Sequence, residues 1–134
     1  MIKLIKQSEN KSDCVLACIA MVSGITLAEV TEFYEKDIPD EGLNIHEELK
    51  LLNKLDIHYI QDVREYMYPN RVYMVTVPSK NNGNIATLHR IVIDNGFSVE
   101  GETRVLDPST KAVYENIESI PWFIQTLEFP EVIG

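Results

Sequence analysis

This chain of 134 residues carries a formal net charge of −9, and hydrophobic residues make up 45% of it. Such a length is typical of one hydrophobic core, and no linker or repeat divides the chain, so we expect a single domain over residues 1–134. Its 12 lysines and arginines form no basic stripe, which argues against a nucleic-acid partner. No run approaches the roughly 20 apolar residues that span a bilayer, and the start lacks a secretory signal, so we expect a cytoplasmic protein without a membrane partner.

The first predicted helix begins at a cysteine. Asp13 or Ser12 can cap its first turn, an apolar run follows, and Gly24 can close it. Cys14 therefore lies at the helix N-terminus, where unsatisfied backbone N–H groups and the positive end of the helix dipole favour the thiolate. The thiolate is the nucleophilic form of cysteine. The same position also suits a cysteine that merely begins a buried helix.

Two more helices are predicted from capping patterns in the first half of the chain. Thr26 and Glu29 have the spacing of a capping box, which predicts a helix that runs through Tyr34. Asn44 and Glu47 repeat that spacing. The helix that follows them carries an apolar stripe on one side, made of Leu49, Leu51, Leu52 and Leu55.

The second half of the chain is predicted to be rich in strands. Apolar and polar side chains alternate over Ile57 to Ile60, and the run from Val72 to Val77 is largely apolar on both faces, as in a central strand. The polar segment Ser79 to Asn84 then reads as a surface connection, with the alternative that it closes over a bound chain.

Two strand-like runs carry a histidine and an aspartate. His89 lies at the start of the first run, and Asp107 ends the second, where Pro108 favours an extended backbone. We expect His89 to pair opposite Asp107, with Ile93 opposite Thr103 and residues 95–101 as the loop.

The alternative to this wide loop is a tight turn at Asn95-Gly96. That turn would set Ile91 beside the charged Glu100, which is unfavourable. In the wide-loop register the Cβ atoms of His89 and Asp107 lie roughly 5 Å apart on one face of the sheet.

An activated thiol needs a base, and a third group that orients the base improves it. His89 is the expected base and Asp107 the expected orienting group. His46 falls in the first turn of a helix, where a solvated role is expected, and no orienting Asp-Pro pair follows His58.

The only cysteines, Cys14 and Cys18, lie about one helical turn apart, so no disulfide framework is expected. Cys18 is expected in the core. The histidines and cysteines match none of the usual zinc spacings, so we expect no metal and no cofactor. A redox-sensing pair of Cys14 and Cys18 is an alternative.

Taken together, the order Gln7, Cys14, His89, Asp107 resembles that of the papain-like cysteine peptidases, most closely their bacteriocin-processing (double-glycine) branch. The matching parts are Gln7 ahead of the cysteine, the run CVLACIAM that enters the helix, His89 opening an apolar strand, and VLDPS at positions 105–109. The resemblance spans nearly the whole chain. It implies an α+β fold in which N-terminal helices pack on an antiparallel β-sheet.

The resemblance also implies a role for each matching residue. Cys14 would be the nucleophile and His89 the general base and acid, while Asp107 would orient the histidine. Gln7 would donate a hydrogen bond in the oxyanion hole, alongside the backbone N–H of Cys14.

We therefore predict a cysteine hydrolase that cleaves a peptide or amide bond of a peptide or protein substrate through a thioester acyl-enzyme. Deamidation or amide transfer would use the same residues. A catalytically inactive binding module on the same scaffold is the alternative from another class, and Val15 favours it because the resembled branch usually has glycine there.

No exporter-like segment is attached and no two glycines are adjacent, so we expect a stand-alone domain without a double-glycine site. The sequence leaves the oligomeric state open.

Overall fold

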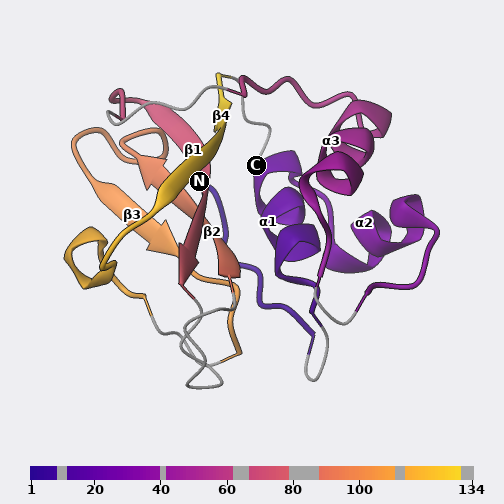
Figure 1. The fold of residues 1–134 in the computed structure, drawn as a ribbon. Helices are drawn as coiled ribbons and strands as arrows, with labels where there is room; N and C mark the ends of the chain where they lie inside the picture. Colours follow the sequence, from indigo (N-terminus) through magenta and orange to yellow (C-terminus); the bar gives the residue numbers. More distant parts are fainter. Residues whose placement is uncertain (9–11, 40–41, 62–66, 79–87, 111–113, 131–134) are drawn as a thin grey trace.

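A computed structural model describes residues 1–8, 12–39, 42–61, 67–78, 88–110 and 114–130. Within them, three α-helices lie together on one side of a four-stranded antiparallel sheet (Figure 1). The predicted α+β class is confirmed. The elements are α1 (Cys14–Ser23), α2 (Leu27–Tyr34), α3 (Ile45–Lys54), β1 (Arg71–Pro78), β2 (Leu88–Asn95), β3 (Thr103–Leu106), a 3-10 helix η1 (Ile117–Ser119) and β4 (Ile124–Phe129).

Helix α1 begins and ends where the sequence predicts. Gly24 adopts a left-handed conformation with φ of 76°, and its N–H donates to the carbonyl of Ala20 at 3.0 Å. Asp13 occupies the N-cap position, but its carboxylate accepts a hydrogen bond from the Ser8 backbone N–H at 2.9 Å instead of capping the helix. The first turn of α1, which holds Cys14, therefore lacks a side-chain cap from Asp13.

Both predicted caps of the other helices are present. Thr26 and Glu29 form a complete capping box at the start of α2. At the start of α3, the Asn44 side chain accepts from the Glu47 N–H at 2.9 Å. No single helix among the described residues is long and apolar enough to cross a membrane.

We expect Thr26→Ala to lower the free energy of unfolding by about 1 kcal/mol, because the Glu29 N–H loses its acceptor, the Thr26 hydroxyl at 3.1 Å. Urea unfolding measures this. Thr31→Ala is the matched control within the same helix, since its hydroxyl only bonds back to the Leu27 carbonyl at 2.7 Å. A loss for Thr31→Ala as large as that for Thr26→Ala would contradict the capping role.

The strand order is β3-β2-β1-β4, so β1 is a central strand, as predicted from the apolar run in it. Strand β4 was not predicted. It carries a bulge where β1 passes from Met74 to Val75, because Met74 pairs with Leu127 while Val75 pairs with Gln125. The expected β-structure at 57–60 is reduced to a single bridge between Ile60 and Glu128.

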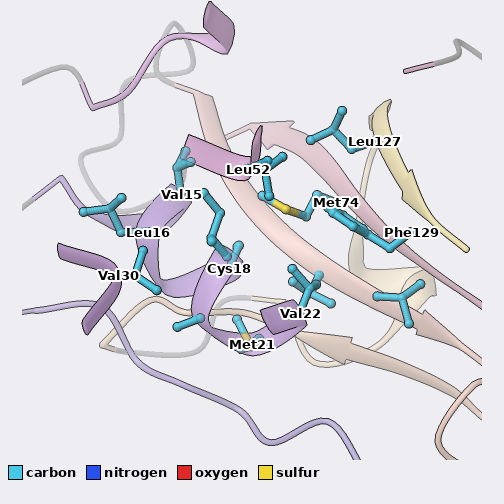
Figure 2. Close-up of a cluster of buried hydrophobic side chains, with 14 of the residues drawn as sticks. Val15, Leu16, Cys18, Met21, Val22, Val30, Leu52, Met74, Leu127 and Phe129 are labelled. Atoms are coloured by element: carbon cyan, nitrogen blue, oxygen red, sulfur yellow. The ribbon is translucent and has the colours of Figure 1, made fainter. Parts of the chain in front are cut away.

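The sheet is buried on both faces. Between the helices and the sheet, side chains from α1, α2, α3, β1 and β4 pack against one another (Figure 2). On the opposite face, Tyr73 and Val75 of β1 pack with Ile91 of β2 and with Tyr114 and Ile120. Alternate residues of β1 thus belong to two separate apolar clusters, one on each face of the sheet.

The pairing of β2 with β3 corrects the predicted register. Asn95 pairs with Thr103, and Ile93 pairs with Val105, so the expected pairing of Ile93 with Thr103 is wrong by two residues. The wide loop itself is present. It begins one residue later than expected because the Gly96 N–H donates to the Glu102 carbonyl at 3.0 Å, which leaves Asn95 in the strand.

A shift of two residues keeps every side chain on its predicted face of the sheet, because side chains alternate with a period of two. His89 and Asp107 therefore still share a face. Continued beyond its last pair, the observed register brings Ser109, rather than Asp107, opposite His89.

The polar segment 79–84, expected to be a surface connection or a loop that closes over a bound chain, lies outside the described residues.

Candidate active site

The N-terminus of α1 meets the start of β2. Cys14, the first residue of α1, and His89, the second residue of β2, line the same cavity, and hydrogen bonding and charge between them lower the pKa of Cys14. The backbone N–H and the charge of Arg90 lower the pKa of the Cys14 thiol in the same direction. The helix end, the imidazole and this backbone group all act on one sulfur atom, and each of them favours its thiolate form.

Asp107 lies on the other side of the His89 ring. Its Oδ1 is 2.7 Å from His89 Nε2, and both side chains are buried. The same oxygen accepts the Ser109 backbone N–H at 2.9 Å, while Oδ2 accepts the Tyr114 N–H at 3.1 Å. The carboxylate is therefore fixed by backbone donors as well as by the imidazole.

The charges in this chain of contacts are mutually dependent. Burial opposes ionisation of Cys14, but the hydrogen bonding and positive charge of His89, together with the backbone and charge of Arg90, outweigh burial, so the pKa of the thiol is lowered from 9.0. Burial likewise opposes protonation of His89, yet the hydrogen bonds and charges of Asp107 and Cys14 raise its pKa from 6.5 to about 9.

The pKa of Asp107 also departs from its usual value. Burial would raise it, but the hydrogen bonds from His89 and Ser109 hold it well below 3.8. The directions of these three pKa shifts favour a thiolate beside an imidazolium, with an ionised carboxylate behind them.

Gln7 is attached to the strand end that carries Asp107. Its backbone N–H donates to the Pro108 carbonyl at 2.7 Å. The next residue, Ser8, donates its N–H to Asp13, the neighbour of Cys14 in the chain. The segment around Gln7 thus runs between the two halves of the site.

A cavity of about 210 Å³ opens beside the sulfur and the imidazole. Its lining includes Thr76 and Arg90, which no sequence motif marks. The residues that line it are Cys14, Val15, Gly42, Leu43, Thr76, His89 and Arg90.

Arg90 is held by a buried ion pair. Its Nη2 lies 2.7 Å from Glu48 Oε2 of α3, and Nη1 donates to the Thr76 hydroxyl. Glu48 is fully buried, and burial raises its pKa despite the charge and hydrogen bond of Arg90. The sequence held a signal for this residue, because Glu48 precedes Leu51 and Leu52 by three and four positions and so lies on the apolar side of α3.

The remaining histidines and the second cysteine lie apart from this chemistry. His46 and His58 are exposed. Cys18 is fully buried, as expected, and donates to the Arg90 carbonyl at 3.4 Å. Burial, followed by the nearby Cys14, raises the pKa of its thiol well above 9.0.

Both cysteines are free thiols. Among the described residues, no group of three histidine, cysteine or acidic side chains is placed to hold a metal ion. Comparison with protein-family models and with curated proteins found no match. The residues of the site therefore carry the functional argument.

Proposed function

We propose that this protein is a cysteine hydrolase with a papain-like fold that cleaves a peptide or amide bond in a peptide or protein substrate. One observation carries the proposal: the continuous chain of contacts from the Cys14 sulfur through the His89 ring to the Asp107 carboxylate. Nucleophile, base and orienting group stand in the order that covalent acyl transfer requires. A cytoplasmic location, where thiols stay reduced, is part of this proposal.

The reaction begins with attack of the Cys14 thiolate on the carbonyl carbon of the substrate. The backbone N–H of Cys14 and the side-chain amide of Gln7 stabilise the negative oxygen that develops. The His89 imidazolium then gives its proton to the leaving amine as the C–N bond breaks, which leaves a thioester on Cys14.

Water completes the cycle. Neutral His89 takes a proton from the water as the water attacks the thioester carbonyl, and the thiolate departs with the imidazolium restored. Asp107 keeps the imidazole oriented and stabilises its positive charge in both half-reactions. The cavity beside Cys14 offers room for the substrate residue next to the scissile bond, with Val15 narrowing it.

A thiol-trapping electrophile tests the proposal without a known substrate. We expect peptide aldehydes to form an adduct at Cys14, because the adduct mimics the tetrahedral species. Mass spectrometry of the native protein detects it, with Cys14→Ala as the control. His89→Ala should slow trapping by at least about 100-fold, because the proton-transfer group is lost. Asp107→Asn should slow trapping less than His89→Ala does, because Asp107 orients the ring and does not transfer the proton itself.

The alternatives predict different results. A deamidase or amide-transfer enzyme would form the same adduct but would release ammonia rather than cleave a chain. A binding module would form no adduct across a varied electrophile panel, and partner binding would survive Cys14→Ala. The last result would overturn the hydrolase.

The pH dependence follows from the two shifted groups. Because the pKa of His89 is raised to about 9, the imidazolium persists through neutral pH and is lost as the pH rises past about 9. Because the pKa of Cys14 is lowered from 9.0, its thiolate persists to lower pH than that of an ordinary thiol and is lost as the pH falls through the lowered pKa. The rate of acyl-enzyme formation is therefore expected to be highest between the lowered pKa of Cys14 and the raised pKa of His89, and to fall at lower and at higher pH. Single-turnover experiments with an activated amide measure it. A rate that keeps rising above pH 9 would contradict the ion pair.

A further inference from the structure

Ser109 is a buried residue that the proposed reaction does not yet use. Only 1% of it is exposed. Its hydroxyl oxygen lies 2.9 Å from His89 Nε2 and 2.7 Å from Asp107 Oδ1. Lys6 fixes the backbone behind it, since Lys6 Nζ donates to the Ser109 carbonyl at 2.9 Å and to the Asp107 carbonyl at 3.4 Å.

The Ser109 hydroxyl oxygen, His89 Nε2 and Asp107 Oδ1 form a triangle of hydrogen-bonding atoms. Counting protons gives each of these atoms a definite role. An ionised Asp107 can only accept, so the 2.7 Å contact to His89 Nε2 requires a proton on that nitrogen. The single hydroxyl proton of Ser109 is donated to Asp107 Oδ1. The Ser109 oxygen therefore turns its lone pairs toward His89 and can only accept from Nε2–H. With Nε2 occupied by two acceptors, Nδ1 is the nitrogen left to exchange a proton with Cys14.

We propose that Ser109 is a positioning residue for this histidine: its hydroxyl accepts the His89 Nε2–H and donates to Asp107, which fixes the ring with Nδ1 toward the Cys14 sulfur. This role rests on the proposed function in that it serves the same nucleophile. Beside the larger effect of Asp107, we expect the hydroxyl to favour the protonated ring as well, because it accepts a hydrogen bond from that ring.

The charged groups around His89 are engaged in other contacts, so the second acceptor at Nε2 is the neutral Ser109 hydroxyl. Cys14 faces the ring from α1, and Asp107 faces it from beyond the end of β3. Arg90, the next residue of β2, directs its guanidinium to Glu48 of α3. Ser109 adds a second acceptor at Nε2 without adding a charge. It therefore helps Asp107 to fix the orientation of the His89 ring.

The test measures thiol chemistry and ring protonation rather than turnover. Iodoacetamide labelling of Cys14 is followed across the neutral and alkaline range in wild type, Ser109→Ala and Ser109→Thr, with His89 titrated by NMR in the same proteins. Ser23→Ala is the matched control, because its buried hydroxyl donates to the Ala20 carbonyl at the far end of α1.

For Ser109→Ala we expect labelling at neutral pH to fall threefold to tenfold, and the midpoint of the His89 titration to move about one pH unit lower. Labelling should converge with wild type at alkaline pH, where the thiolate forms without the imidazolium. Ser109→Thr, which keeps the hydroxyl, should restore most of the rate, and Ser23→Ala should match wild type.

Unchanged profiles in Ser109→Ala, or an equal loss in Ser23→Ala, would overturn the role of Ser109. If Ser109→Ala does not fold, the nitrogen NMR signals of wild-type His89 decide: an Nε2 without a proton at neutral pH overturns the proposal. The two proposals fail separately: if peptide aldehydes form no adduct at Cys14 while Ser109→Ala still lowers iodoacetamide labelling, the hydrolase is refuted and the positioning role is retained.

Discussion

The change His89→Ala is expected to slow alkylation of Cys14 at neutral pH by about 100-fold. Burial opposes ionisation of this thiol, and His89 makes the largest of the contributions that lower its pKa, with a smaller one from Arg90. Without the imidazole, burial acts with much less opposition, so we expect the pKa of Cys14 to rise and its thiolate population to fall. Mass-resolved iodoacetamide labelling measures the rate at each cysteine.

Two kinds of control accompany this experiment. His46→Ala and His58→Ala remove exposed histidines, so both should label like wild type. Cys18, fully buried and with a raised pKa, should label far more slowly than Cys14 in every variant. Equal rates at the two cysteines, or a Cys14 rate insensitive to His89→Ala, would place Cys14 among structural residues. Coupled oxidation of both sulfurs under mild oxidant would instead support the redox pair.

The second large effect concerns stability. Glu48→Ala is expected to lower the free energy of unfolding by about 3–5 kcal/mol, because it leaves the Arg90 cation buried without its partner carboxylate. Urea unfolding, followed by circular dichroism, measures it. Glu47→Ala on the same helix is the matched control. Its partner Lys36 is well exposed at 59%, and a loss below about 1 kcal/mol is expected.

A double variant separates the cost of an unpaired charge from the value of the pair. Because removing two charges from water costs about as much as their attraction returns, we expect the pair to contribute little net stability. Glu48→Leu combined with Arg90→Met should therefore recover most of the loss seen in Glu48→Ala. If the double variant is no more stable than Glu48→Ala, the buried pair itself stabilises the fold.

Much of the fold could be predicted because its signals are local. Gly24 ends α1, Thr26 and Asn44 begin the next two helices, and the apolar run around Val75 marks a central strand. Strand β4 escaped prediction because its bulge interrupts the alternation, and because it buries Glu128 against Arg71 at 3.2 Å. Such a pairing depends on contacts far apart in the chain.

The proximity of the site residues could be predicted better than their details. The register of β2 and β3 was off by two residues, yet His89 and Asp107 kept a common face because side chains alternate with a period of two. Ser109 entered the triangle through that same shift. Arg90 and Glu48 are 42 positions apart, so their pairing required the packing of a helix against a strand.

A thiolate titration tests the central claim, an ion pair between Cys14 and His89, most directly. The ultraviolet absorbance of the thiolate is recorded against pH in wild type and in Cys14→Ala, so that the contribution of Cys18 cancels in the difference. We expect a midpoint below 9.0 in wild type that moves upward in His89→Ala. A midpoint at or above 9.0 in wild type, unmoved by His89→Ala, would contradict the ion pair and with it the proposed hydrolase.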